Sequence, residues 1–372
     1  VENQQNNGTF LPPNNQKVSA FLYDFVSTYG EKKWGVSMYD SQTALIANYI
    51  NPIIGDLEVQ AITPRVVDKY IQTLQKTPSV SRKNRKARTE FVTNSTIEKI
   101  IKLLRCAFKQ AVRWELVGKN PFENTVLPKT EYKKRDIWNA ETIRIALDQC
   151  TDNKLYIAMN LAFACSLRIG EILGLTWDDI HFAENANDTS WLQVSKTLLE
   201  VYKLAAAATE SRDILMVFPS TKPNSNMSLI LKKPKTKHSI RKVYLPRTTA
   251  DILKEWHIRQ LELIDLLGAD YQNYNLVLAQ NSGKPYDSHQ IYKLLKTFIH
   301  AHQLPDVTFH SLRHSSVTYK LALNDGNIKL VQGDTGHASP KLMLNTYAEI
   351  FDQSRKELAV RFEENFYAAL QP

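Results

Sequence analysis

The chain of 372 residues lacks long apolar runs, paired cysteines and glycine-rich loops. No stretch of about 18 consecutive apolar residues occurs, so we expect no membrane-spanning helix. No secretory signal opens the sequence. The three cysteines form no C-x-x-C pair and lie among apolar residues. This argues against a disulfide framework or a zinc ribbon and fits buried thiols in a reducing compartment.

Acidic residues are scarce in one segment, and this shortage concentrates the positive charge of the chain. The formal net charge is +9, from 47 Lys and Arg against 38 Asp and Glu. Residues 80–135 hold 15 Lys and Arg but only 5 Asp and Glu, so this segment carries the whole excess. A concentrated basic segment is typical of a surface that binds a polyanion. A basic run by itself is as often a solvated surface.

The first third of the chain has the pattern of a helical domain. Residues 1–16 are polar with two adjacent prolines, and we expect a flexible lead-in. Apolar residues then recur at helical spacing, and Thr63 followed by Pro64 is typical of a helix N-terminus. We predict an all-helical domain over residues 17–125 and a linker over residues 126–136.

The helix expected over residues 97–112 has an apolar stripe on one face and cations on the other. One face can pack inside the domain while the other meets DNA phosphates. With the basic stretches before this helix and in the linker, these cations form the predicted DNA-binding set. Its members are Arg82, Lys83, Arg85, Lys86, Arg88, Lys99, Lys102, Arg105, Lys109, Arg113, Lys133, Lys134 and Arg135.

A second domain is predicted over residues 137–355, with a mixed pattern. Apolar periodicity predicts helices over residues 139–147, 155–175, 248–267, 288–302 and 311–323. Alternation predicts strands over residues 191–197 and 242–245. Residues 203–228, rich in Ala, Ser and Asn, have the composition of an insertion in a strand–loop–strand unit. The expected fold class is therefore mainly α with a small β-sheet.

Four short segments of the second half carry residues that could act together on a phosphate. They are SLRIGEILGL (166–175), PKTKHSIRKVYLP (234–246), FHSLRHSSVTYKL (309–321) and TGHASPKLMLNTYAEI (335–350). Each alone fits an ordinary structural role. With 16 tyrosines in the chain, a tyrosine is more often a half-buried core residue than a nucleophile. Together, the segments supply two arginines, a lysine and two histidines, followed by a tyrosine.

This combination suits a phosphate site with a nucleophile. The planar fork of arginine matches phosphate oxygens, and lysine or histidine can donate a proton to a leaving oxygen. A phenol has an ordinary pKa of about 10 and needs positive neighbours or a base. Because a Gly-rich phosphate loop and a carboxylate cluster are lacking, nucleotide hydrolysis and two-metal cleavage are disfavoured. Zinc held by His310, His314 and His337 is a competing interpretation, although no H-E-x-x-H glutamate accompanies them.

In this order, the four segments resemble the tyrosine recombinase (phage integrase) family. RIGE at 168–171 matches the first arginine motif of that family, and HSLRH at 310–314 matches its H-x-x-R-H motif. The dipeptide at 336–337 matches its G-H motif, and NTY at 345–347 matches the setting of its nucleophile. Lys235 precedes an expected strand, where the lysine of the family lies on a β-hairpin.

The resemblance implies a site-specific DNA recombinase that needs no cofactor or metal. The implied catalytic residues are Arg168, Lys235, His310, Arg313, His337 and Tyr347. The arginines and histidines would hold the scissile phosphate, with His310 also acting as acid or base. Lys235 would protonate the departing 5′ oxygen while Tyr347 forms a 3′-phosphotyrosyl bond. The reaction would integrate or excise a mobile element of a phage or transposon.

The resemblance also implies the domains and the partners. It covers residues 137–355 as the mixed α/β catalytic domain and, more loosely, the helical domain as a core-binding (SAM-like) DNA-binding domain. The implied partners are double-stranded DNA, three further copies in a homo-tetramer, and accessory DNA-bending or excision proteins, with no membrane. The implied location is the nucleoid in the bacterial cytoplasm. Residues 356–372 carry a one-sided apolar stripe, and we expect a helix that docks on a neighbouring protomer.

Some features depart from the family pattern. Ser311 stands where Asp is frequent, and residues 332–335 are more polar than the usual apolar run. The insertion at 203–228 is longer than a hairpin needs. No additional N-terminal arm-binding domain is evident, which, with the initial Val, fits a trimmed chain. Alternatives to Lys235 as the acid are Lys232, Lys233 and Lys237.

Two other functions remain open at this point. One is a type IB topoisomerase-like enzyme, which would relax DNA by the same chemistry. The other is a DNA-binding regulator with a degenerate site. The separate helical domain and the linker favour recombination over relaxation, and the six filled catalytic positions argue against a degenerate site.

Overall fold

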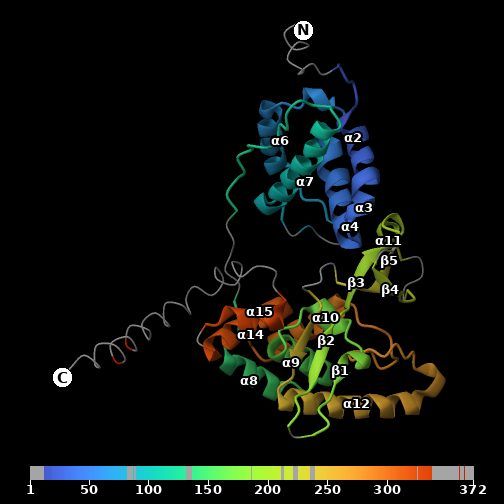
Figure 1. Cartoon of the computed structure of the whole chain (residues 1–372), viewed down its shortest axis with the longest axis vertical. Coiled ribbons are helices and arrows are strands. Elements are labelled where there is room, and N and C mark those ends of the chain that lie inside the picture. Colours follow the sequence, from blue (N-terminus) through green and yellow to red (C-terminus); the bar gives the residue numbers. More distant parts are fainter. Residues whose placement is uncertain are drawn as a thin grey trace. The chain divides into compact units, whose positions relative to one another are not determined.

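The computed structural model forms two compact units (Figure 1). The first comprises Val1–Lys133 and Val201–Arg212, and the second comprises Lys134–Glu200 and Asp213–Pro372. Each unit has a hydrophobic core of its own. No helix among the described residues is long and apolar enough to cross a membrane. The structure describes residues 12–81, 87, 89–130, 136–185, 187–210, 213–220, 225–234, 239–324, 326–336, 360 and 364.

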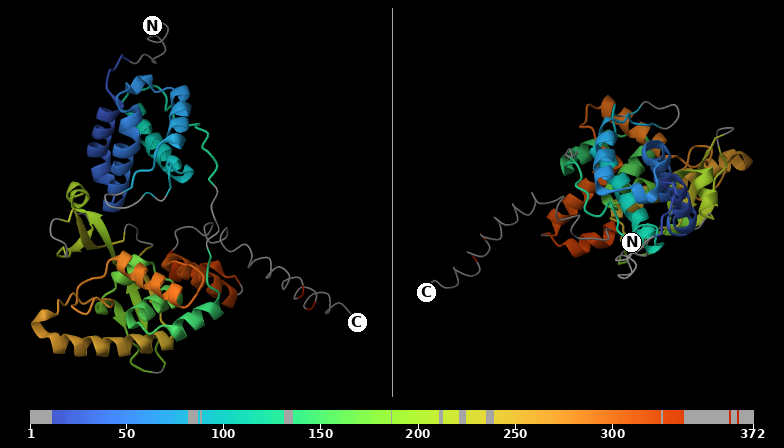
Figure 2. Two further views of the ribbon diagram at one scale, coloured as in Figure 1. Left: turned by 180° about the vertical axis from the view of Figure 1, so that it is seen from behind. Right: turned by 90° about the horizontal axis from the view of Figure 1, so that it is seen from above.

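The first unit is a bundle of helices (Figure 2). It contains α2 (Val18–Phe25), α3 (Glu31–Lys33), α4 (Val36–Leu45), α5 (Asn51–Ile54), α6 (Pro64–Lys76), α7 (Asn94–Arg113) and α11 (Lys203–Ala208). Single π turns, Val26–Gly30 and Ile46–Ile50, join α2 to α3 and α4 to α5. The predicted start of α6 is confirmed, because Thr63 Oγ1 accepts the backbone N–H of Val66 at 3.4 Å and Pro64 opens the helix.

The apolar stripe predicted on α7 is confirmed as the centre of this bundle. Phe108 of α7 packs against Phe21 and Phe122, with ring centroids 5.5 and 4.9 Å apart. The buried residues of α7 are Ile97, Ile100, Ile101, Leu103, Leu104, Ala107, Phe108 and Ala111. Because this stripe faces the core, the cations of α7 are left on its outer side.

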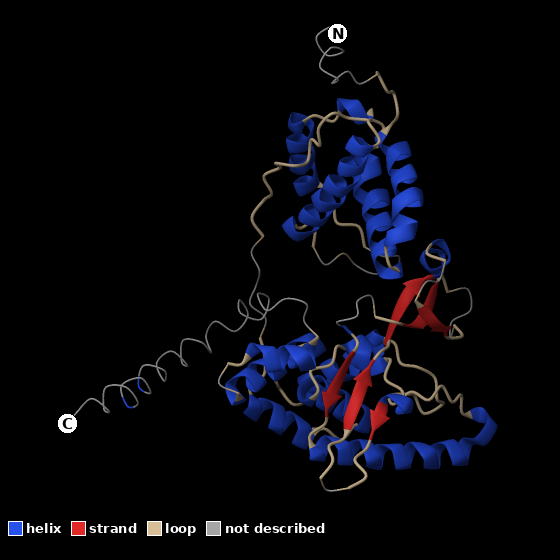
Figure 3. Cartoon of the chain, viewed as in Figure 1, coloured by secondary structure: helices blue, strands red, loops and turns tan. Residues whose placement is uncertain are grey.

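The second unit combines helices with two small sheets (Figure 3). Its helices are α8 (Ala140–Gln149), α9 (Asn153–Ala164), α10 (Ile169–Leu173), α12 (Arg247–Leu267), α13 (Ser288–Ala301), α14 (Phe309–Leu323) and α15 (Ile328–Thr335). The strands are β1 (Ile180–His181), β2 (Trp191–Val194), β3 (Thr197–Tyr202), β4 (Ile214–Val217), β5 (Met227–Lys232) and β6 (Arg241–Tyr244). The last two residues of β3, Val201 and Tyr202, are counted with the first unit. The predicted fold class, mainly α with a small β-sheet, is confirmed.

The predicted insertion is a folded excursion between two paired strands. β2 pairs with β6 in an antiparallel sheet of order β1-β2-β6, with Leu192 opposite Val243. The chain between β2 and β6 forms a second sheet of order β3-β5-β4 and the helix α11. The strand–loop–strand unit is therefore real, and the insertion carries regular structure of its own.

A single helix over residues 155–175 is predicted from periodicity, and this prediction is wrong. The structure ends α9 at Ala164 and begins α10 at Ile169. Ser166 between them has φ of 53°, in the left-handed region that a non-glycine residue seldom adopts. The chain turns there, and Arg168 becomes the N-cap residue of α10 instead of a residue inside a long helix.

Candidate active site

Arg168 is positioned by the first turn of α10. Its backbone N–H donates to Oε2 of Glu171 at 2.9 Å, and its Nη1 donates to Oε1 of Glu171 at 2.7 Å. The carboxylate of Glu171 thus accepts a backbone N–H at the N-terminus of α10 and also fixes the guanidinium of Arg168. The side chain of Arg168 is 40% exposed, so part of it remains accessible from outside.

Two glycines let α10 approach β3 closely. A Cβ atom at Gly170 would lie 2.6 Å from Oγ1 of Thr197. A Cβ atom at Gly174 would lie 2.9 Å from the backbone N of Leu198. Both distances are too short for ordinary contacts, so this approach requires residues without a side chain. Gly170, which the family motif contains, therefore serves packing beside Arg168.

Arg313 lies in α14 with only 1% of its side chain exposed. Its Nη1 donates to the carbonyl of Ser166 and its Nη2 to the carbonyl of Thr335, each at 2.5 Å. Nη1 also lies 3.8 Å from Oε2 of Glu171. The left-handed turn at Ser166 thus presents a carbonyl to the guanidinium, and a 2.6 Å hydrogen bond between the hydroxyls of Ser166 and Ser316 holds that turn against α14.

A third arginine, Arg241 at the start of β6, completes the group and was missed by the sequence analysis. Its Nη1 and Nη2 donate to Oε1 and Oε2 of Glu171 at 3.1 and 2.9 Å. Its side chain is 5% exposed. The alternation of residues along this strand could have identified it. Arg241 is in phase with the buried Val243 and Leu245, so its side chain is expected to face inward, where an arginine needs a partner.

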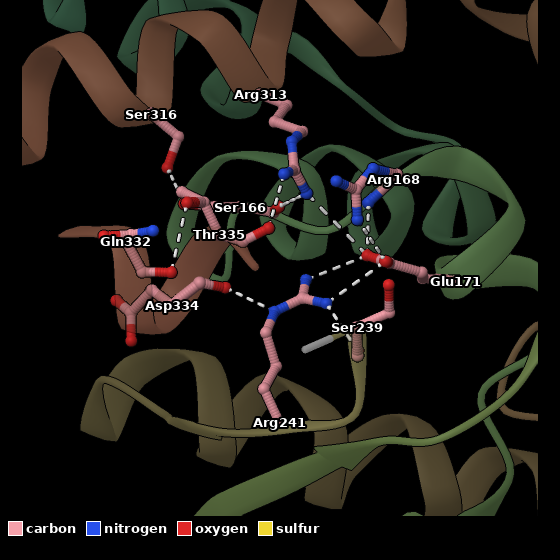
Figure 4. A network of polar contacts seen from close by, with 10 residues as sticks. All are labelled: Ser166, Arg168, Glu171, Ser239, Arg241, Arg313, Ser316, Gln332, Asp334 and Thr335. Carbon is pink, nitrogen blue, oxygen red and sulfur yellow. Dashed lines mark hydrogen bonds and ion pairs between the residues drawn. The ribbon is translucent and has the colours of Figure 1, made fainter. Parts of the chain in front are cut away.

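Arg168, Arg241 and Arg313 therefore surround one carboxylate, and we call them the arginine cluster (Figure 4). Burial alone would raise the pKa of Glu171. Hydrogen bonds from Arg241 and its charge, together with Arg168, outweigh burial and hold that pKa at about 2. Glu171 is consequently ionised at neutral pH, and it offsets only part of the positive charge of the three arginines.

The last turn of α15 is fastened to the same cluster. The carbonyl of Asp334 accepts a hydrogen bond from Nε of Arg241 at 2.6 Å, and that of Thr335 accepts one from Arg313. Helix C-terminal carbonyls lack partners within the helix and favour cations, which both arginines supply. Asp334 also pairs with Lys320 of α14 at 2.6 Å. This ion pair gives Asp334, one of the polar residues at 332–335, a structural role.

Gly336 ends α15 in the left-handed conformation with φ of 60°, a common helix C-terminus. The helix itself was not predicted. Its end matters for the site, because the next residue in the chain is His337. The bonds from the arginine cluster therefore hold the segment from which His337 departs.

The start of α14 carries the predicted histidine pair. His310 is exposed, and its ring meets that of His314 edge-on with centroids 4.4 Å apart. Oγ1 of Thr308 accepts the backbone N–H of Ser311 at 3.2 Å, and Oγ of Ser311 accepts the N–H of Thr308 at 3.3 Å. Ser311 thus closes a capping box, which explains how it replaces the frequent Asp.

Three predicted catalytic residues, Lys235, His337 and Tyr347, lie outside the described residues, as does Lys237. Of the alternative lysines, Lys232 is the last residue of β5, and the exposed Lys233 donates its backbone N–H to the carbonyl of Asp213 at 2.8 Å. In the described part of the chain, no three His, Cys, Asp or Glu side chains are grouped so that they could hold a metal ion.

The predicted DNA-binding cations that the structure describes all lie on α7. Lys99, Lys109 and Arg113 are exposed. Lys102 is exposed and pairs with Glu98 at 2.6 Å. Arg105 differs from them, because its Nε donates to the carbonyl of Phe122 at 2.9 Å and the side chain is half-buried. The remaining members of the set lie outside the described residues: Arg82, Lys83, Arg85, Lys86, Arg88, Lys133, Lys134 and Arg135.

Comparison with known proteins agrees with this architecture. A model of the phage integrase family matches residues 219–354. The ICEBs1 integrase of Bacillus subtilis (strain 168) is 24% identical over 332 residues, which cover 88% of this chain and 77% of that protein.

Two solved structures have the same fold. The Tn1549 transposon integrase in complex with a circular intermediate DNA is 17% identical with a TM-score of 0.68, covering 92% of this chain and 99% of that one. A lambda integrase tetramer bound to a Holliday junction is 14% identical with a TM-score of 0.53, covering 88% of this chain and 76% of that one. The sequence motifs, the fold and the match of residues 219–354 to the phage integrase family model agree with one another and support a tyrosine recombinase.

Proposed function

We propose that this site-specific recombinase cuts a DNA strand by attack of Tyr347 on the scissile phosphate and later rejoins the strand to a partner. The observation that carries the proposal is the convergence of Arg168 and Arg313, from two different helices, on Glu171. Arginine guanidinium groups match the oxygens of a phosphate, and pre-placed positive charge stabilises the extra negative charge of its transition state. A phosphate could reach the exposed part of the Arg168 side chain.

The proposed cleavage step exchanges one phosphoester bond for another. Tyr347 Oη forms a bond to phosphorus while the bond from phosphorus to the 5′ oxygen breaks. Lys235 donates a proton to that oxygen, and His310 accepts the phenolic proton and, with His337, contacts the phosphate. The products are a 3′-phosphotyrosyl linkage and a 5′ hydroxyl. A 5′ hydroxyl of a partner strand reverses the step, so the bond energy is retained and no nucleotide is consumed.

DNA binding would be divided between the two parts of the chain. We assign core DNA binding to residues 17–125, catalysis to residues 137–355 and a linker to residues 126–136. The exposed cations of α7 would neutralise backbone phosphates. The biological reaction would be integration or excision of a mobile element on the nucleoid, in the bacterial cytoplasm, with accessory DNA-bending or excision proteins.

The oligomer would be a tetramer on two DNA sites. Support comes from the lambda integrase tetramer, which shares the fold. It also comes from the apolar stripe of residues 356–372, for which we propose docking on a neighbouring protomer. Deletion of residues 357–372 should prevent assembly of higher complexes on DNA in a gel-shift experiment while a single protomer still binds. Unchanged assembly would count against docking in trans.

The test of the chemistry begins with recovery of the target. Sheared genomic DNA of the strain that carries the gene is incubated with the protein, the reaction is stopped with detergent, and fragments linked to protein are sequenced. A duplex with the recovered site and a nick beside the cleavage position then loses the 5′ hydroxyl fragment and traps the covalent product. Wild-type protein should form the adduct and Tyr347→Phe should not.

Tyr319→Phe is the matched control, because Tyr319 lies in α14 and packs against Phe163 with ring centroids 5.7 Å apart. It should form the adduct at the wild-type level. An adduct that persists in Tyr347→Phe would overturn the assignment. Exchange of strands between two sites, and not relaxation of supercoiled DNA alone, distinguishes recombination from a topoisomerase-like activity.

A further inference from the structure

Arg241 uses its whole guanidinium inside the second unit. Nη1 and Nη2 donate hydrogen bonds to the two carboxylate oxygens of Glu171. Nε donates to the carbonyl of Asp334 at 2.6 Å, and Nη1 also donates to the carbonyl of Ser239 at 3.2 Å. With 5% of the side chain exposed, Arg241 does not have the accessibility of Arg168. These contacts point to a residue that acts through its neighbours (Figure 4).

The neighbours of Arg241 belong to the segments that carry the candidate catalytic residues. Glu171 holds the guanidinium of Arg168 at 2.7 Å. The carbonyl of Asp334 lies in the last turn of α15, three residues before His337. Arg241 itself stands six residues after Lys235, at the start of the strand that follows it. One side chain therefore links three elements that are far apart in sequence.

Only arginine can make this set of contacts. The three nitrogens lie in one plane, so two can meet the carboxylate oxygens while the third, on another edge, reaches a carbonyl. A lysine at this position keeps the charge beside Glu171 but has a single nitrogen. It would leave the carbonyl of Asp334 without this donor and would hold Glu171 through one nitrogen in place of two.

We propose that Arg241 is a positioning residue of the recombinase. It sets the orientation of Glu171, and through it that of Arg168, and at the same time it fastens the end of α15 that leads to His337. The inference rests on the proposed function, because its effect is measured on DNA cleavage. A shift of about 1 Å in groups that bind a transition state can lower a rate about 100-fold, so the effect of disturbing Arg241 should be kinetic.

The test uses full-length wild-type protein, Arg241→Lys and Arg241→Met with the nicked duplex at saturating concentration. The rate constant of adduct formation should fall roughly 10- to 100-fold in Arg241→Lys and further in Arg241→Met, since lysine restores the charge but not the geometry. The dissociation constant for the duplex should change less than about threefold, because most of the affinity comes from other phosphate contacts.

Lys196→Met is the matched control for a purely structural loss. Nζ of Lys196 pairs with Asp179 at 2.9 Å, and the two side chains are 19% and 8% exposed, so this ion pair is buried in the same unit. Nζ of Lys196 also donates to Oγ1 of Thr176 at 2.8 Å, and neither partner belongs to the arginine cluster. The control should lower the melting temperature, as the Arg241 variants do, but leave the rate constant within about twofold of wild type.

The amplitude and the rate constant of adduct formation separate folding from positioning. Unfolded protein lowers the amplitude only, whereas a misplaced Arg168 lowers the rate constant of the folded fraction. Should Arg241→Met fail to fold, Arg241→Lys still decides the matter. A wild-type rate constant in Arg241→Lys, or an equal loss in Lys196→Met, would overturn the inference while the wild-type adduct upholds the proposed function. If wild-type protein forms no adduct, the proposed function fails and the inference falls with it.

Discussion

The two positively charged regions of the molecule hold their cations in opposite ways. In the arginine cluster, Arg241 and Arg313 are 5% and 1% exposed. Both donate to backbone carbonyls, and Arg241 also donates to Glu171, at distances of 2.5–3.2 Å. On α7, Lys99, Lys109 and Arg113 project into solvent. A cation held in one place stabilises the charge of a transition state at one point, whereas solvent-exposed cations neutralise DNA phosphates at many positions. The cluster should therefore govern rate and stability, and α7 should govern affinity and its dependence on salt.

The largest effect is expected from Arg313→Lys. A lysine cannot donate to the carbonyls of Ser166 and Thr335 and also serve a phosphate, so the rate constant of cleavage should fall about 100- to 1,000-fold. Single-turnover adduct formation on the nicked duplex measures it. Arg113→Lys on α7 is the counterpart and should cleave at the wild-type rate with saturating DNA. Equal rates for the two variants would erase the distinction between the regions.

Next in size is the effect of Glu171→Gln on stability. The pKa of Glu171 is lowered from 4.5 to about 2, so its charge stabilises the fold above pH about 4.5 and this contribution is lost as pH falls towards 2. The substitution should cost about 3 kcal/mol of unfolding free energy at pH 7, measured by urea unfolding, and progressively less below pH about 4.5.

Glu98→Gln on α7 provides the comparison for that prediction. Glu98 pairs with Lys102, whose side chain is 62% exposed. Solvent-exposed pairs contribute little, so this variant should lose less than about 1 kcal/mol and show little change with pH. A Glu171→Gln variant as stable as Glu98→Gln at pH 7 would show that the cluster carries no net stabilisation.

A smaller effect is expected from a substitution that disturbs the packing of α10 against β3. In Gly174→Ala, the new Cβ would lie 2.9 Å from the backbone N of Leu198, and backbone can yield only by moving α10. Thermal unfolding should report a loss of about 1–3 kcal/mol. In Gly333→Ala the Cβ would meet nothing within 4 Å, so this variant should match or slightly exceed wild type through helix propensity. Equal melting temperatures would argue against close packing of α10 on β3.

The smallest effects per residue are expected on α7. Lys99→Ala, Lys109→Ala and Arg113→Ala should each reduce the slope of log affinity against log salt by about 1 and change stability by less than about 0.5 kcal/mol. Fluorescence anisotropy with the recovered DNA site measures the slope. Because Arg105 donates to the carbonyl of Phe122, Arg105→Ala should instead cost stability. Unchanged slopes in all three variants would remove α7 from the DNA interface.

The sequence predicted the features that follow from local pattern. The amphipathic stripe of α7, the N-terminus of α6 at Thr63 and the existence of the strands β2 and β6 need only periodicity and capping chemistry. The break between α9 and α10 could not be foreseen in the same way. Ser166 adopts a left-handed conformation against its own preference, and the contacts that hold it there come from α14, about 150 residues away.

The candidate site shows the same limit. Arg168 and Arg313 could be named from their motifs, because a short pattern identifies them. Arg241 has no motif of its own and gains its role from Glu171, 70 residues earlier, and from Asp334, 93 residues later. Such a role depends on tertiary placement, which residue type and spacing do not contain.

The assignment of Tyr347 as the nucleophile can be tested by identifying the residue that becomes bonded to DNA. The adduct trapped on the nicked duplex is digested with a protease and a nuclease, and the peptide that carries a nucleotide is sequenced by mass spectrometry. A single modified residue is expected, Tyr347, joined through its phenolic oxygen to a 3′ phosphate. A linkage at any other residue, or at a 5′ phosphate, would contradict it.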